Sequence, residues 1–543
     1  MSSPTPQPVD EREKLAAPAA SDGSNAEEQR AKSIEGSITG ARWFIVNVAV
    51  LSATFLYALD NTVTANVRPA MAETFGNRID MLPWLSVAYP MGEVGANPLW
   101  GKLNGQFEKK CLFLAAVLIF EIGSAVIGSA QSIEAVVAGR AIAGFGGSGI
   151  YVGTINILSA LTTPVERNQS LNNVGIAWSL GTILGPIIGG AFADSAATWR
   201  WAFYINLCLA VLTIPPSIWL VPTLVPATSL GLAKRIKQVD YLGAILFIGG
   251  TVTTVMILGF GGAVYAWNSS QMSGLYVAAV VLWVAFALQQ RFYWLTVDRI
   301  FPVQLFGNWL TVALFIWTAI AISDIVVTIY SLPLFFQFAF GETSLRSAVY
   351  ILAFVLPAIA GAGSSGVLLA KFPYYKAWFF WASALMLIGN GLLSTISYET
   401  SRGAVCGYSV IVGLGVGPVI QLGFTVAQQK NRRTTTSDIS AFCSCAQMGG
   451  LALSLGLATT VFLDRATGAL SAILPDLSRT AIQESINGAN TGLLESLDAD
   501  VRLRVLQAIA HSVGTVFYLN MAGAALGLLI AIPMKFERLD FSQ

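Results

Sequence analysis

Fourteen apolar stretches, each long enough to cross a lipid bilayer, follow one another along the chain with short polar connections between most of them. A helix that spans a bilayer needs about 20 apolar residues, and each stretch is close to that length. Backbone N–H and C=O groups inside lipid must form hydrogen bonds within the protein, which favours helices over open strands. The sequence therefore predicts an all-α polytopic membrane protein with helices at roughly 43–66, 81–101, 111–130, 134–158, 171–193, 201–222, 240–260, 273–289, 309–332, 347–370, 377–396, 403–427, 437–462 and 513–534.

The composition excludes several classes of function. Of the 543 residues, 55% are hydrophobic and only 11% are charged, whereas a soluble domain carries about 25% charged residues. A net charge of +1 argues against a nucleic-acid partner. His511 is the only histidine, which excludes His-rich metal or catalytic clusters, and no Walker A motif is present to use ATP. We therefore expect no metal, no cofactor and no enzymatic activity.

The distribution of lysine predicts which loops face the cytoplasm. Lysines such as Lys102, Lys109, Lys110 and Lys234 all fall in alternate loops, as the positive-inside rule requires of cytoplasmic segments. Both termini are then cytoplasmic, and residues 1–42 form a polar, disordered tail. The longest loop, 464–512, faces outward. Asn268 begins an N-glycosylation pattern in another outer loop, close to the membrane.

Ionisable and polar residues inside the predicted spans are candidates for function, because such groups are costly in the hydrocarbon region. The charged candidates for proton coupling are Asp60, Glu93, Glu121, Arg140 and Asp324. A purely structural role, such as packing or clamping helix ends, is the alternative for each of them. The polar residues Asn390, Gln421 and Gln447 either form hydrogen bonds between helices or line a cavity for an amphipathic organic substrate.

A run of small residues marks the fifth predicted span. Residues 178–190 contain four glycines around a proline, namely Gly181, Gly185, Pro186, Gly189 and Gly190. Glycines at this spacing form a smooth stripe that a neighbouring helix can approach closely, and the proline removes a backbone hydrogen bond and bends the helix. For a shorter motif, close packing of two helices would be a sufficient explanation. The full string resembles the signature of span five in proton-coupled exporters of the major facilitator superfamily.

Further segments of the sequence resemble motifs of the same superfamily. Gly101 and Lys102, followed by Lys109 and Lys110, resemble the cytoplasmic gating loop of that superfamily, although its usual aspartate position holds Gly105. Residues 139–146, with Arg140, resemble the span-four motif. Residues 59–63 and 199–206 resemble the fourteen-span drug:proton antiporters. The closest resemblance is to their branch of fungal toxin and multidrug efflux pumps, through residues 101–103, 120–124 and 199–206.

This resemblance implies two six-helix bundles with two inserted spans, and a central cavity that opens alternately to each side. The expected divisions are a tail at 1–42, a bundle at 43–222, loops and two extra spans at 223–308, a second bundle at 309–535 and a cytoplasmic tail at 536–543. Asp60 would bind and release a proton, and Arg140 would hold its charged state or the substrate.

The function implied is proton-coupled export of small amphipathic organic molecules, such as a secondary metabolite, toxin or drug, by a monomer. The plasma membrane is the expected location, with a vacuolar or vesicular membrane as the alternative. An uptake permease for siderophore-like molecules shares the fourteen-span plan and stays open. A membrane receptor or a membrane-embedded enzyme would belong to another class, and the shortage of His and Cys and the lack of a large soluble domain argue against both.

Overall fold

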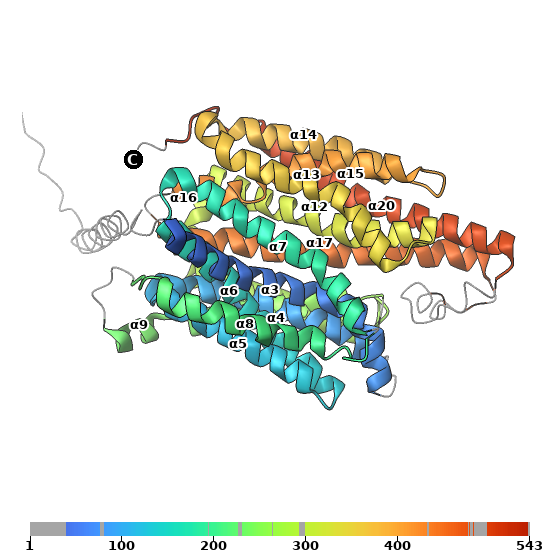
Figure 1. Ribbon diagram of the computed structural model, residues 1–543, viewed down its shortest axis with the longest axis horizontal. Coiled ribbons are helices and arrows are strands. Elements are labelled where there is room, and N and C mark those ends of the chain that lie inside the picture. The colour runs from blue at the N-terminus through green and yellow to red at the C-terminus, as the bar shows by residue number, and fades with distance from the viewer. Residues whose placement is uncertain are drawn as a thin grey trace, which may run out of the picture.

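The computed structural model contains two helix bundles that lie side by side (Figure 1). It describes residues 40–75, 81–193, 195–225, 231–262, 264–292, 299–431, 434–475, 477, 482 and 497–540. The amino-terminal bundle consists of α3 (Gly40–Thr74), α4 (Leu82–Gln106), α5 (Lys109–Ser129), α6 (Ile133–Leu161), α7 (Pro164–Ala193) and α8 (Trp201–Leu220). Within this bundle α3 packs along α7, and α6 packs between α4 and α5.

The carboxy-terminal bundle repeats this plan. It consists of α12 (Trp309–Phe340), α13 (Ser344–Lys371), α14 (Tyr375–Ser394), α15 (Arg402–Val416), the 3₁₀ turn η3 (Gly417–Val419), α16 (Leu422–Lys430), α17 (Thr436–Ile473) and α20 (Ala499–Ala531). The span expected at 403–427 is therefore broken into α15, η3 and α16. The break falls at Pro418, which lacks the N–H that a continuous helix would use.

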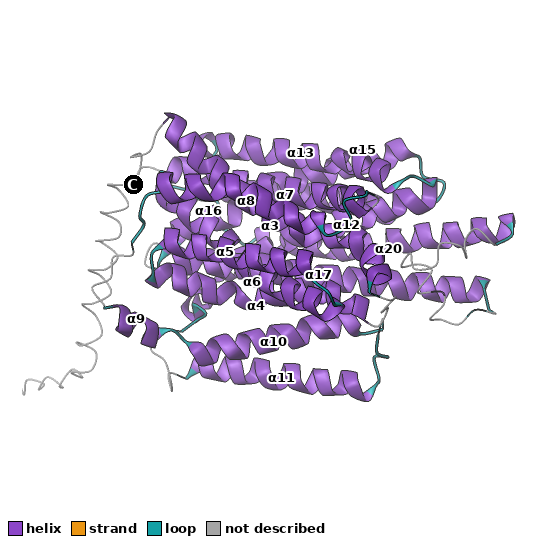
Figure 2. Cartoon of the chain, turned by 60° about the horizontal axis from the view of Figure 1, so that its bottom comes forward, coloured by secondary structure: helices purple, strands orange, loops and turns teal. Residues whose placement is uncertain are grey.

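Two further helices lie along one edge of the bundles. They are α10 (Tyr241–Phe260) and α11 (Ser270–Arg291), which run beside each other in Figure 2. α10 packs against α4 and α17, and α11 packs on α10. The buried carboxylate of Asp240 ties the start of α10 to the end of α11, because it accepts hydrogen bonds from the side chains of Gln289 and Gln290 and from the backbone N–H groups of Gly243 and Ile300. The short helices α9 (Leu232–Gln238) and η2 (Val303–Gly307) flank this pair in the chain.

The predicted fold class is confirmed. In the described part of the chain, thirteen segments are long and apolar enough to cross a membrane. The fourteenth predicted span is α4, whose 25 residues include the buried polar side chains of Glu93, Asn97 and Lys102. These polar groups are shielded by protein, because α4 packs against α6, α10 and α17. The helix is therefore less apolar than the others and more deeply enclosed.

The helix boundaries differ from the predicted ones in the segment 464–512 and at the two termini. The segment expected as an outer loop, 464–512, is helical at both ends, because α17 continues to Ile473 and α20 begins at Ala499. These helices are longer than a bilayer requires and extend past the others in Figure 1. The expected tail at 1–42 lies mostly outside the described residues, and α3 begins at Gly40. In the tail expected at 536–543, the N–H of Leu539 donates to the carbonyl of Pro373.

Candidate functional site

The glycine stripe of α7 lies directly against α3. A β-carbon added at Gly181 would meet the carbonyl oxygen of Phe55, and one at Gly189 would meet that of Val63. At Gly185 it would meet the hydroxyl of Thr62, which donates a 3.0 Å hydrogen bond to the carbonyl of Thr182 in α7. Gly190 is partly exposed, and Pro186 lies within the same helix. Only a helix without side chains on this face allows so close an approach, and the contact fixes the part of α3 that carries Asp60.

Asp60 and Arg140 form an ion pair inside the amino-terminal bundle. The Nη1 atom of Arg140 lies 3.1 Å from Oδ2 of Asp60 and donates a 2.8 Å hydrogen bond to the Asp60 carbonyl. Asn206 of α8 donates to Oδ1 of Asp60 at 3.0 Å and to the hydroxyl of Ser124 at 3.2 Å. The two charged side chains are 0% and 2% exposed. Removing either charge would leave the other buried without its partner, which costs about 3–5 kcal/mol.

Glu121 lies near this pair on α5. Its side chain is buried, and neither carboxylate oxygen has a hydrogen-bond partner in the described part of the chain. As an ionisable group in a span, Glu121 stays a candidate for a role in transport.

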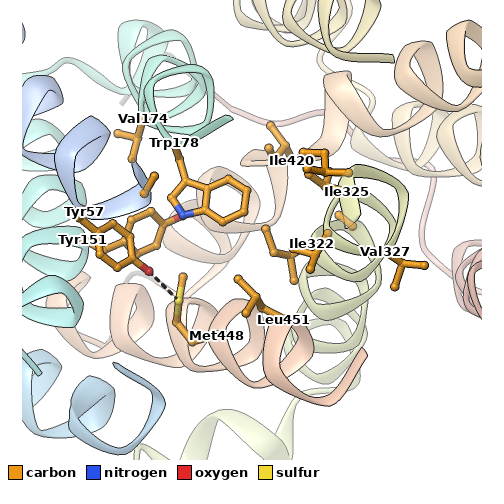
Figure 3. Close-up of a cluster of buried hydrophobic side chains, with 14 of the residues drawn as sticks. Tyr57, Tyr151, Val174, Trp178, Ile322, Ile325, Val327, Ile420, Met448 and Leu451 are labelled. Carbon is orange, nitrogen blue, oxygen red and sulfur yellow. Dashed lines mark hydrogen bonds between the residues drawn. The ribbon is translucent and has the colours of Figure 1, made fainter. Parts of the chain in front are cut away.

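Glu93 lies between the two bundles, at the middle of α4. The hydroxyl of Tyr57 donates to its Oε1 and also lies 3.2 Å from the sulfur of Met448 in α17 (Figure 3). Tyr89 connects this group to the ion pair, because its hydroxyl donates to the carbonyl of Tyr57 at 3.0 Å. The Arg140 guanidinium lies 4.3 Å from the centre of the Tyr89 ring, a cation–π distance.

The polar residues expected to line a cavity separate into two groups. Gln421 donates to the hydroxyl of Tyr151 at 2.9 Å, and that hydroxyl donates to Gln447, so both glutamines lie where α6 meets the other bundle. Asn390 lies instead inside the carboxy-terminal bundle, where it donates to Asp324. The reason is the orientation of α14, whose polar face is turned toward α12 and α20 within the bundle.

A small apolar cavity lies beside this interface. Gly175 and Ser179 of α7 form one wall, and Ile325, Phe354 and Ile420 belong to the opposite side. Trp178, which precedes Ser179 in α7, belongs to the same buried cluster as Ile325 and Ile420 in Figure 3. Its indole Nε1 is buried and has no hydrogen-bond acceptor among the described residues. The lining is mostly apolar and carries no charge.

Asp324 of α12 is another buried carboxylate that accepts hydrogen bonds from side-chain amides. Asn390 donates to its two oxygens at 3.0 and 3.2 Å, and Asn520 of α20 donates to Oδ1 at 2.7 Å. All three side chains are nearly inaccessible to solvent. No lysine or arginine of the described residues forms an ion pair with Asp324.

The half of the interface between the bundles that is expected to face the cytoplasm is closed. Asn172 of α7 donates to the hydroxyl of Ser365 and to the carbonyl of Ala362 in α13 at 3.1 and 2.9 Å. Asn97 of α4 donates to Ser444 of α17 at 2.7 Å. Further side-chain hydrogen bonds join the bundles in this half and in the centre of the interface. The interface is therefore sealed at this end in this conformation.

The residues expected to form the gating loop lie at the same closed end of this interface. A β-carbon at Gly101 would meet the side chain of Ala441, so α4 and α17 touch closely there. Lys102 is buried beside it, and Lys109 and Lys110 begin α5. Asn268 is exposed in the loop before α11, at the opposite end of the protein.

Several residues of the site could not be identified from the sequence. Tyr57, Tyr89 and Tyr151 surround Glu93, and Asn520 binds Asp324, yet none of them belongs to a motif recognised in the chain. Asn206 does belong to the string 199–206, but its contact with Asp60 depends on how α8 is rotated. No cluster of three or more potential metal-binding side chains occurs among the described residues.

Comparison with known proteins gives a consistent result. The family model for the Major Facilitator Superfamily matches residues 50–455. The MFS-type transporter pgmG of Aspergillus terreus is 39% identical over 529 residues, covering 96% of this chain and 94% of that protein. The efflux pump alnA of Emericella nidulans is 36% identical over 509 residues, covering 93% and 92%. The structure of the human organic anion transporter MFSD10 (TETRAN) is similar in fold, with a TM-score of 0.55 and 15% identity, covering 90% of this chain and 100% of that chain.

Proposed function

The chain belongs to the major facilitator superfamily, as its motifs predicted, and on that premise we propose that it exports small amphipathic organic molecules in exchange for protons. Relatives named as efflux pumps, and a transporter named for a phomenoic acid biosynthesis cluster, support export of a fungal secondary metabolite or toxin. The uncharged, mostly apolar lining of the cavity beside the interface suits an amphipathic molecule better than a charged one. The family is one of transporters, and we assign the chain no catalytic activity.

One observation carries the proposal of proton coupling. Tyr89 contacts both the Asp60–Arg140 pair, through its ring, and Tyr57, through its hydroxyl. Tyr57 in turn binds Glu93 and contacts Met448 of the other bundle. Protonation of Asp60 would weaken its attraction for Arg140, and any shift of Arg140 would reach the interface through these contacts. A change of charge would thereby favour one arrangement of the bundles over the other.

The steps of the exchange follow from this geometry. In the present conformation the cytoplasmic side is closed, and Asp60 is held as an anion by Arg140 and Asn206. A proton that arrives from outside neutralises Asp60 and releases Arg140. The bundles then rearrange, and the hydrogen bonds of Asn97 and Asn172 across the cytoplasmic interface open. Substrate enters from the cytoplasm as the proton leaves, and the ion pair forms again.

Asp60→Asn tests this role, because it keeps the shape of the side chain and removes its titration. Cells with and without the protein are first compared for metabolites inside and outside, which identifies the exported molecule. Export of that molecule is then measured in sealed vesicles with and without an imposed pH gradient. We expect Asp60→Asn to bind substrate but to lose the response to the gradient, whereas the exposed control Glu399→Gln responds like the wild type. An unchanged response of Asp60→Asn would contradict the assignment.

We further propose that the protein acts as a monomer in the plasma membrane. Export of a metabolite out of the cell requires that membrane, while storage would require a vacuolar or vesicular one. Asn268 is exposed at the outer end and remains a candidate for glycosylation. An epitope tag placed after Ile473, between α17 and α20 in the chain, should be accessible on intact cells, and one at Lys234 should need permeabilised cells.

A further inference from the structure

We infer that Asp324, together with Asn390 and Asn520, forms a second proton-binding site, located inside the carboxy-terminal bundle. The inference deepens the proposed function, on which it rests for its role in transport. It concerns a different carboxylate from Asp60, in a different bundle. Two observations support the inference: an arrangement of residues that both bundles share, and one difference between the bundles.

The shared geometry is a carboxylate on the first helix of a bundle that is bound by an asparagine on the last. Asp60 of α3 accepts from Asn206 of α8, and Asp324 of α12 accepts from Asn520 of α20. The third helix of each bundle places a polar side chain at the same position along its length. Ser124 and Asn390 each lie fifteen residues after the first residue of α5 and α14. Repeated halves of this kind place equivalent sites at equivalent positions.

The difference is the cation. Arg140 lies seven residues after the start of α6, and the residue at that register of α15 is Ser409, whose hydroxyl donates to the carbonyl of Val405 in its own helix. A buried carboxylate without a cation is strongly destabilised in its charged form. Binding a proton removes that charge. Protonation therefore stabilises the Asp324 carboxyl group more than that of Asp60, whose charge is balanced by Arg140.

No other charged or titratable group of the surrounding helices contacts Asp324. The helices packed around α12 within the described residues carry titratable side chains, but none of them forms a hydrogen bond or an ion pair with Asp324. These groups are Tyr350, Arg346 and Lys371 of α13, Tyr375 and Lys376 of α14, Arg402, Cys406 and Tyr408 of α15, Lys430 of α16, Asp438, Cys443, Cys445, Asp464 and Arg465 of α17, and Asp500, Arg502, Arg504, His511 and Tyr518 of α20.

The two asparagines can serve both protonation states. Their Nδ2 groups donate to the carboxylate, while the Oδ1 atoms of Asn390 and Asn520 are buried and have no hydrogen-bond partner among the described residues. A protonated carboxyl group has an O–H to donate. Rotation of either amide would turn its Oδ1 toward that O–H and provide an acceptor that now has no partner. The site thus contains both the donors that an anion needs and the acceptors that an acid needs.

The position of Asp324 connects this site to the substrate pathway. The next residue, Ile325, lines the apolar cavity, while Asp324 is turned toward α14 and α20. α12 therefore carries the proton site on one face and the cavity wall on another. A change in the hydrogen bonds of Asp324 alters how α12 is held against its neighbours, and with it the shape of the cavity.

The test detects the proton directly on the full-length protein, purified and reconstituted in lipid vesicles. Infrared difference spectra between acidic and alkaline pH report the C=O band of protonated carboxyl groups. We expect Asp324→Asn to lose a band that Asp60→Asn and the control Glu399→Gln keep. Asn520→Leu retains Asp324 but changes its hydrogen bonding, so the same band should shift in frequency. This second variant gives an independent readout if Asp324→Asn folds poorly.

Two outcomes separate this inference from the proposed function. Spectra of Asp324→Asn and Asn520→Leu that match the wild type would overturn the second site, even if export responds to a pH gradient. Loss of the band in Asp324→Asn supports the site even if export by the wild-type protein proves insensitive to the gradient, in which case proton-coupled export itself is wrong.

Discussion

The two bundles use the same helix positions to bury a carboxylate but surround it with different chemistry. Asp60 has an arginine partner and lies on a helix that is held by a glycine stripe. Asp324 has two asparagines, and the corresponding contact between α12 and α17 includes a close approach at Gly450, which faces the carbonyl of Ala319. The amino-terminal bundle thus pairs its carboxylate with a cation, whereas the carboxy-terminal bundle provides a site whose charge is balanced only by neutral dipoles. One scaffold therefore supports two kinds of ionisable site.

The largest expected effect comes from filling the glycine stripe. Gly185→Leu would place side-chain atoms where the Thr62 hydroxyl and the α3 backbone lie, and forced packing of this kind costs about 1–3 kcal/mol. We expect export to be abolished while the amount of protein in the membrane stays near normal. The matched control is Gly449→Leu in α17, where no atom lies within 4 Å of an added β-carbon. Normal export by Gly185→Leu would show that the close contact of α3 and α7 is not required.

A matched pair of asparagine variants tests the difference in charge. Asn206→Leu removes a hydrogen bond to the ionised Asp60, and Asn520→Leu removes one to Asp324, which we infer to be neutral once protonated. Hydrogen bonds to charged groups contribute about 1.5–3 kcal/mol, and neutral ones about 0.5–1.5 kcal/mol. We therefore expect Asn206→Leu to lower the unfolding free energy more than Asn520→Leu, as measured by denaturation of the purified protein at mildly acidic pH. Equal losses would indicate that both carboxylates carry the same charge.

The sequence predicted the fold well and the site in part, for a physical reason. Lipid forces apolar, hydrogen-bonded helices of a given length, so the spans are visible in hydropathy alone. Asp60 and Arg140 could be paired in advance because each lies in a family motif. The partners of Asp324 are 66 and 196 residues away in helices that are apolar on most faces. Hydropathy does not report the rotation of such helices, so the sequence left open whether Asn390 lines a cavity or forms hydrogen bonds between helices, and in the structure it donates to Asp324.

The smallest effect on stability that we expect comes from a contact at one end of the carboxy-terminal bundle. Glu537 binds Lys430 of α16 at 2.8 Å and the Tyr375 hydroxyl of α14 at 2.9 Å. The hydrogen bond from Lys430 lowers the pKa of the Glu537 carboxyl below its ordinary value, with a further contribution from Tyr375. Because the folded protein holds this carboxyl ionised, the stabilisation is complete above the ordinary pKa of 4.5 and is lost as the pH falls through the lowered value.

Glu537→Gln isolates this contact. The pair is well exposed, so its contribution is below about 1 kcal/mol. We expect the variant to melt slightly below the wild type at neutral pH and to approach it in acid, while export stays unchanged. Thermal unfolding in detergent at a series of pH values measures this, with Glu399→Gln as the exposed control. A difference that grows toward acidic pH would mean that the interaction has the opposite sign. A clear loss of export would mean that this contact takes part in the transport cycle, and the carboxy-terminal bundle would then depend on a charged pair as the amino-terminal bundle does.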